Sequence, residues 1–172
     1  MPGLVFLILS FLINSINYEQ HELTILPNSR NERTFVLVKP DSVQRGYFGD
    51  LLSRLEKKGF RLVLMKFLLP EKEIMEEHYE EHKNNPSFDE RIQCMLTGPV
   101  VASVWEGPGV IAEVRRVLGP TNPLETSSAT IRGDFCLSPR RNLCHASDSA
   151  KSAIREIHLW FSGREEGRFL KM

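Results

Sequence analysis

Short apolar runs rich in β-branched residues alternate along this chain with longer segments of helical periodicity. The run at 34–39 reads TFVLVK and is closed by Pro40, and the run at 60–69 is closed by Pro70. Runs of the first kind predict strands, whereas apolar residues recurring every three or four positions predict amphipathic helices. A chain with this alternation has to bury its helices against a sheet, which favours a mixed α and β architecture.

The order of the predicted elements narrows the architecture further. Strands are predicted at 34–39, 60–69 and 100–105, and within 130–137. Helices are predicted between Asp41 and Gly59, over 71–83, from Pro86 to Met95, over 110–118 and over 149–161. The order is βαββαβ with additional helices, which predicts an α+β, ferredoxin-like fold. We therefore expect a four-stranded antiparallel sheet covered by helices on one face, with 120–129 a loop and 139–147 irregular.

A length of 172 residues fits one folded domain with tails. We predict a hydrophobic extension and linker at 1–31, the folded domain at 32–161 and a short tail at 162–172. Leu4–Ile13 is apolar except for Ser10, but a membrane-spanning helix needs about 20 such residues. No Lys or Arg precedes this segment, unlike in a secretory signal. A membrane tether and a weak signal peptide both remain open.

Composition excludes some classes of function. The formal net charge is zero, so the basic excess typical of non-specific nucleic-acid binding is missing. The three cysteines, Cys94, Cys136 and Cys144, form no CxxC pair and match no zinc-site spacing. We expect reduced thiols in a cytoplasmic protein, associated with a membrane through residues 2–13, with the mitochondrial surface as one candidate, and not secreted.

Phosphate binding would depend on individual side chains, because the sequence contains neither a GxxxxGK[ST] nor a GxGxxG motif. Lys39, Arg115 and Arg132 each lie where a predicted element begins or ends. Arg can bind two phosphate oxygens in parallel and Lys acts as a point charge. Taken singly, each is more simply explained as a solvated surface charge.

His145 lies in the segment RNLCHASDS, between a loop and a predicted helix. Neutral imidazole is a good nucleophile toward phosphorus, and a carboxylate such as Glu156 could fix its tautomer. A surface histidine is the alternative, as helix capping is for Ser147, Asp148 and Ser149.

Several segments, taken together, resemble nucleoside diphosphate kinases. NLCHASDS is similar to that family's NxxH[GA]SDS signature, and VKPDSVQRG, KKGFRLV, GPVVASVWEG, LGPTNP and TIRGDF resemble further family segments in the same order. The resemblance covers about residues 32–161. It implies a ferredoxin-like fold and a kinase that transfers the γ-phosphate of an NTP, mainly ATP, to an NDP by a ping-pong mechanism.

The resemblance also implies roles for single residues. His145 resembles the phosphorylated histidine, attacking through Nδ1, with Glu156 as its carboxylate partner and Ser147 nearby. The positions implied to contact phosphates or ribose are Lys39, Tyr79, Arg115, Thr121, Arg132 and Asn142. Mg²⁺ is expected on the nucleotide phosphates rather than in a protein cage. A homo-oligomer, hexameric by resemblance, is implied, and residues 2–13 are similar to the membrane-associated extension of a eukaryotic subgroup.

The chain departs from the family pattern in three places. Ser87 stands where the family has an aromatic residue that stacks on the nucleobase, so either stacking is weaker or Phe88 substitutes. Pro139 stands where a small aliphatic residue is common, and residues 162–172 replace a longer tail that holds subunits together. These departures leave two alternatives open: a membrane-tethered interaction protein with reduced catalysis, and phosphohistidine transfer to a protein.

Overall fold

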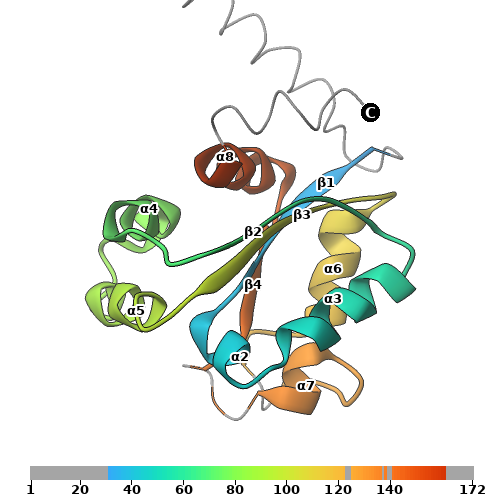
Figure 1. Ribbon diagram of the computed structural model, residues 1–172, viewed down its shortest axis with the longest axis horizontal. Helices are drawn as coiled ribbons and strands as arrows, with labels where there is room; N and C mark the ends of the chain where they lie inside the picture. The colour runs from blue at the N-terminus through green and yellow to red at the C-terminus, as the bar shows by residue number, and fades with distance from the viewer. Residues whose placement is uncertain (1–30, 123–124, 137, 139–140, 162–172) are drawn as a thin grey trace, which may run out of the picture.

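The computed structural model describes residues 31–122, 125–136, 138 and 141–161. They form a four-stranded antiparallel sheet flanked by helices, with the strands in the order β2-β3-β1-β4 (Figure 1). The strands are β1 Arg33–Val38, β2 Arg61–Leu68, β3 Val100–Glu106 and β4 Cys144–Ala146. This topology confirms the predicted ferredoxin-like fold.

Most predicted helices are confirmed, with shifted ends. The helices are α2 Pro40–Gln44, α3 Phe48–Lys57, α4 Lys72–His78, η1 Glu80–His82, α5 Phe88–Met95, α6 Val110–Leu118, α7 Ile131–Phe135 and α8 Ala150–Phe161. The helix predicted between Asp41 and Gly59 is thus two helices, and the one predicted over 71–83 is an α-helix followed by a 3₁₀ turn.

The strand predicted within 130–137 is wrong, because this segment contains α7. The side chain of Thr130 accepts a hydrogen bond from the backbone N of Gly133 and caps the helix. The fourth strand, β4, lies instead within the stretch predicted to be irregular. It has three residues, which is too short for an alternating pattern to be recognised.

Helices cover both faces of the sheet, so the expectation of one covered face is also wrong. Val36 and Val38 of β1 pack with residues of α3 and α6, whereas Phe35 and Leu37 pack with α4, α5 and α8 (Figure 1). Every residue of β3 is buried, as expected for a central strand of a sheet that is covered on both faces.

The predicted extension at 1–31, except Asn31, and the tail at 162–172 lie outside the described residues. Within the described ranges, no helix has the length and apolar character needed to cross a membrane.

Candidate active site

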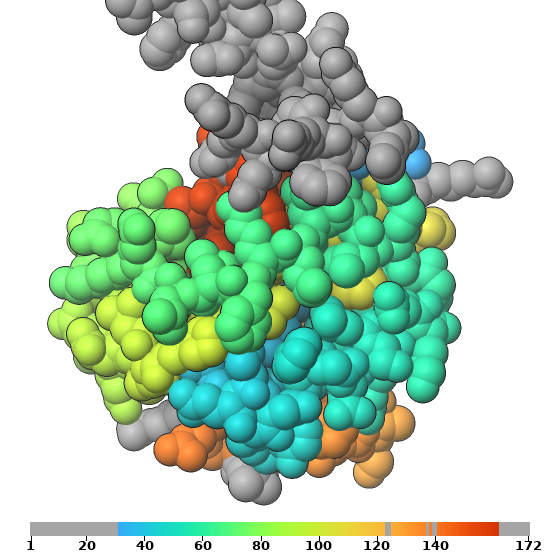
Figure 2. Space-filling view, viewed as in Figure 1, coloured from blue at the N-terminus to red at the C-terminus, as the bar shows by residue number. Residues whose placement is uncertain are grey.

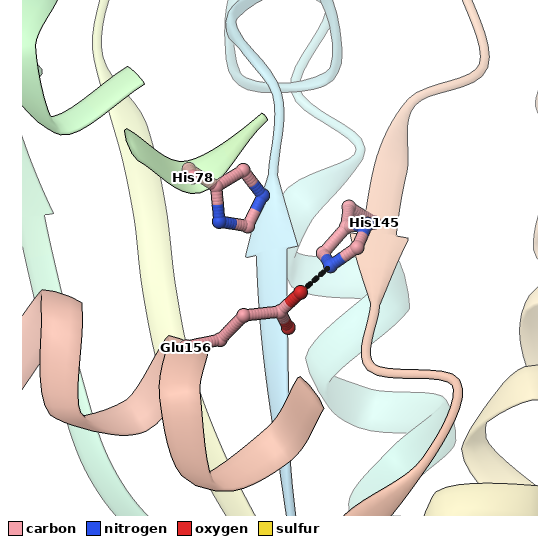
Figure 3. A group of neighbouring side chains, drawn as sticks. All are labelled: His78, His145 and Glu156. Carbon is pink, nitrogen blue, oxygen red and sulfur yellow. Dashed lines mark hydrogen bonds and ion pairs between the residues drawn. The ribbon is translucent and has the colours of Figure 1, made fainter. Parts of the chain in front are cut away.

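His145 lies at the centre of β4, opposite Leu37 of β1. Its Nε2 atom is 2.9 Å from Oε1 of Glu156, which projects from α8 (Figure 3). A carboxylate accepts but does not donate hydrogen bonds, so this contact places a proton on Nε2. In the neutral ring the lone pair is then on Nδ1, the nitrogen predicted to attack phosphorus.

Glu156 is itself held in place. Only 3% of the residue is exposed, and its second oxygen accepts a hydrogen bond of 2.7 Å from Oγ of Ser147. Ser147 is anchored in turn to the backbone of Phe35, whose N donates to Ser147 Oγ at 3.2 Å. Ser149, rather than Ser147, caps α8 by accepting from the backbone N of Ser152. His145, Glu156 and Ser147 therefore form one connected unit, as their assignment together predicts.

His78, at the end of α4, contacts this unit but was not singled out from the sequence. Its ring meets that of His145 at 85°, with 4.7 Å between centroids. Burial holds the pKa of His78 well below its usual value, and the nearby His145 lowers the pKa further. The sequence signal that could have revealed His78 is its position on the apolar side of the helix predicted over 71–83, beside Met75 and Tyr79.

His78, His145 and Glu156 bring three metal-ligating atoms within 4.8 Å of one another (Figure 3). However, Trp160 Nε1 donates to Nδ1 of His78 at 3.3 Å. Because indole is only a donor, the neutral His78 ring carries its proton on Nε2. With Nδ1 accepting the indole proton and Nε2 protonated, neither nitrogen of the neutral His78 ring offers a free lone pair, which opposes metal binding here.

Lys39 follows β1 and approaches the same edge of the sheet. Its Nζ donates to Oδ1 of Asn142 at 2.6 Å. Burial lowers the pKa of Lys39 to about 8, while the charge of Arg132 lowers it and that of Asp41 raises it. An ammonium group with a lowered pKa is stabilised when an anion binds beside it, which suits phosphate.

A strained turn presents Asn142 and begins β4. Leu143 has a φ of 68°, and the backbone N of Cys144 donates to the carbonyl of Asn142 at 2.8 Å. Such three-residue turns with positive φ are rare and strained. They persist only where the surroundings enforce them.

Arg132 supplies that enforcement. Its buried guanidinium donates to the carbonyls of Asn142 at 3.2 Å, Gly119 at 2.5 Å and Cys144 at 2.7 Å. The structure thus brings Arg132 next to the site, with its donors directed to the backbone around Leu143. Its predicted contact with a phosphate stays a prediction.

A pocket of about 760 Å³ opens beside this turn. Among the residues predicted to bind a nucleotide, Lys39, Ser87, Thr121 and Asn142 line it. Its other walls come mainly from α2 and from one side of α5. The volume is within the range of 300–1,000 Å³ that is usual for small-molecule sites.

Other predicted residues lie outside the pocket lining. Tyr79 is buried, its hydroxyl has no hydrogen-bond partner in the described part of the chain, and burial raises its pKa. Phe88 packs against the apolar cluster under α4, α5 and α8, so the structure does not support it as a substitute for the missing aromatic. Arg115 is exposed and reaches the carbonyl of Ala146 at 3.3 Å, next to His145.

Sequence reasoning did not single out three further cations that line the pocket, Arg45, Arg91 and Arg141. No periodicity marks them, because each lies on a different element of the chain.

Comparison with known proteins shows the family of the chain. Residues 32–166 match the family model described as nucleoside diphosphate kinase. The chain is 49% identical over 138 residues to the nucleoside diphosphate kinase of Saccharomyces cerevisiae, covering 80% of this chain and 90% of the yeast protein. It is 52% identical over 134 residues to nucleoside diphosphate kinase B of Bos taurus. The match covers 78% of this chain and 88% of the bovine protein. The structure also superimposes on a halophilic nucleoside diphosphate kinase from Halobacterium salinarum, solved in complex with CDP, with a TM-score of 0.76 and 44% sequence identity. The match covers 78% of this chain and 90% of the halophilic protein.

Proposed function

The chain belongs to the nucleoside diphosphate kinase family, and from that premise we propose that His145 carries the phosphoryl group in a ping-pong reaction. In the first half, the γ-phosphate of an NTP, mainly ATP, moves to His145 and the NDP leaves. In the second half, a different NDP accepts the phosphoryl group. The net exchange maintains the GTP, CTP and UTP pools.

The contact between His145 and Glu156 supports this proposal most directly. Nδ1 of His145 attacks the γ-phosphorus, so an N–P bond forms as the bond to the leaving NDP oxygen breaks. Positive charge develops on the ring, and the Glu156 carboxylate, 2.9 Å from Nε2, stabilises it. Ser147 fixes the carboxylate through its 2.7 Å hydrogen bond, so that little reorganisation is needed when the charge appears.

The walls of the pocket supply the remaining catalysis. Phosphoryl transfer mainly requires positioning and neutralisation of charge. Lys39, Thr121 and Asn142 line the pocket and bind phosphate or ribose oxygens in this proposal. Arg115 lies beside the β4 residue Ala146 and reaches the transferred group. Arg132 holds the turn around Leu143 through the carbonyls of Asn142 and Cys144 and ties it to the end of α6 through that of Gly119.

The kinase works with a divalent metal, and we propose Mg²⁺ carried by the nucleotide. Within the described ranges, Asp41 and Glu90 are the carboxylates of the pocket wall, against the cations Lys39, Arg45, Arg91 and Arg141. This excess of positive charge repels a bare cation but accepts a nucleotide with its ion. Bound there, Mg²⁺ offsets part of the phosphate charge.

Labelling tests the function. Full-length protein incubated with γ-³²P-ATP is expected to gain an acid-labile label, which GDP then removes as labelled GTP. His145→Gln is expected to remove both steps, because glutamine cannot form the N–P bond. His158→Gln, at an exposed position of α8, is the matched control and is expected to label normally. Label on the His145→Gln variant would refute the assignment.

The same experiment separates the alternatives. An interaction protein with reduced catalysis would label slowly or not at all. Phosphohistidine transfer to a protein would give labelled enzyme that keeps its phosphoryl group when GDP is added. The connected His145, Glu156 and Ser147 favour catalysis over an interaction protein. The adjoining pocket, lined by Lys39 and Arg91, favours a nucleotide over a protein as the acceptor.

We further propose that the chain forms a homo-oligomer through β2. This strand lies at the edge of the sheet, and Figure 2 shows it uncovered by helices. Met65, Phe67 and Leu69 are 50%, 63% and 71% exposed. Exposed apolar edge strands are typical of surfaces that pair with another chain. Phe67→Lys is expected to reduce the mass measured by light scattering, and an unchanged mass would refute this surface.

For localisation, we propose a cytoplasmic protein attached to a membrane through residues 2–13. The support is compositional: the segment is apolar, whereas 28–32 is polar and can serve as a spacer. The proposed chemistry also uses ATP and Mg²⁺, which are abundant in the cytoplasm.

A further inference from the structure

One side of α5 forms a wall of the pocket. Ser87, Glu90, Arg91 and Cys94 all line it, and their spacing of three, four and seven residues is that of a single helix face. Phe88, at the border of this face, does not line the pocket and packs into the core. The helix therefore offers the pocket no aromatic ring, and its largest pocket-lining side chain is Arg91.

Arg91 is held in a defined position. Its guanidinium carbon lies 5.3 Å from the centroid of the Tyr79 ring, and Tyr79 is only 5% exposed. A guanidinium is planar and packs well on aromatic faces, which lysine cannot imitate. The buried ring thus supports one side of Arg91.

Among the described residues, the guanidinium of Arg91 has no partner besides the Tyr79 ring. Across the described residues, no hydrogen bond or ion pair joins its guanidinium to a carboxylate or carbonyl. Arg45, on the facing wall, differs in this respect, because its guanidinium donates to the carbonyl of Phe135 at 3.0 Å. A half-buried guanidinium with free donors and a free face, lining a pocket, is arranged to meet a planar ligand group.

We propose that Arg91 is the platform on which the nucleobase stacks, with Tyr79 behind it, and that it gives the site a preference for purine over pyrimidine nucleotides. This inference deepens the proposed function, because it requires a nucleotide in the pocket. Bases stack on arginine as well as on aromatic rings. The interaction of a cation with a π face grows with the size of the ring system, and purines offer the larger face. Ser87, one turn earlier, leaves the space that a stacking aromatic would fill.

Binding of ADP, GDP, CDP and UDP to the full-length protein tests the proposal by calorimetry with Mg²⁺ present. Arg91→Gln removes the charge and Arg91→Lys keeps the charge but removes the plane. For both variants, the Kd for ADP and GDP is expected to rise about tenfold, which corresponds to about 1.4 kcal/mol. The Kd for CDP and UDP is expected to rise about threefold or less. Circular dichroism melting of each variant verifies folding.

The variants distinguish stacking from simple charge attraction. If Arg91→Lys bound all four nucleotides like the original protein, the charge alone would matter and the platform would be refuted. An equal loss for all four nucleotides with Arg91→Lys would place Arg91 on the phosphates and also overturn the proposal. Binding is measured without turnover, so failure of phosphoryl transfer to His145 would refute the proposed function while leaving this result interpretable.

Discussion

Replacing Glu156 by glutamine tests the arrangement around His145 most sharply. The carboxylate uses both oxygens, one at 2.9 Å from Nε2 of His145 and one accepting from Ser147 at 2.7 Å. Glutamine has nearly the same shape but only one acceptor oxygen. That oxygen can accept a hydrogen bond from Ser147 or from His145, but not from both. If the NH₂ group of the glutamine faces the ring, the His145 proton moves from Nε2 to Nδ1 and blocks the nucleophilic nitrogen.

Two independent arguments set the size of the effect. Hydrogen bonds to charged groups contribute about 1.5–3 kcal/mol. A full charge on a ring about 4 Å from the carboxylate gains about 4 kcal/mol at an effective dielectric constant of about 20. A transition state that carries roughly half of that charge gains about 2 kcal/mol, within the first range. A loss of about 2 kcal/mol slows phosphorylation of Glu156→Gln about 30-fold, and the full range of about 1.5–3 kcal/mol corresponds to about 10- to 150-fold.

Rapid quench with γ-³²P-ATP under single-turnover conditions measures this step directly. Ser147→Ala leaves the carboxylate in place and removes one neutral donor, so a slowing of about fivefold is expected, about 1 kcal/mol. Glu77→Gln, an exposed acid on α4, serves as the control for a general loss of negative charge. A rate within twofold of the original protein for Glu156→Gln, at an unchanged melting temperature, would refute the reasoning.

The other predictions use the remaining walls of the site. The kcat/KM is expected to fall as the pH rises through about 8, because Lys39 with its lowered pKa loses the charge that binds phosphate. The fall in kcat is expected at higher pH, since bound phosphates stabilise the Lys39 ammonium group. Lys39→Arg should remove the fall in kcat/KM, because arginine keeps its charge at this pH. A flat pH profile of kcat/KM for the original protein would contradict the prediction. Arg132→Ala is expected to lower both the rate and the melting temperature, because three carbonyls lose their donor. Arg115→Ala should lower the rate alone. Equal melting temperatures of the two variants would contradict the role of Arg132 in holding the turn around Leu143. Deleting residues 1–31 is expected to leave catalysis intact and move the protein to the soluble fraction, and equal fractionation of both chains would exclude the tether.

Much of the fold is readable in the sequence because its signals are local. The apolar β-branched run of β1 and the helical spacing of α6 depend on neighbouring residues, so they appear without knowledge of the tertiary structure. α7 and β4 escape such reading. Thr130 caps a helix of five residues, and β4 is defined by its pairing with β1 rather than by its three side chains.

The candidate catalytic group was recognisable because its residues lie close in the chain. His145, Ser147 and Glu156 fall within β4, the turn that follows it and α8, and the motif around them resembles that of a known family. Sequence alone therefore determined the nucleophile candidate, the kind of chemistry and the class of fold.

Only the tertiary structure decided which other side chains join that group. His78 and Trp160 are 82 positions apart, and Arg91 lines the same pocket as Lys39 and Asn142 although it is distant from both in the sequence. Phe88 and Arg91 lie within one turn of the same helix, yet one enters the core and the other faces the pocket. The physical reason is that a helix exposes or buries a residue according to the layer packed against it, and that layer is made by distant parts of the chain.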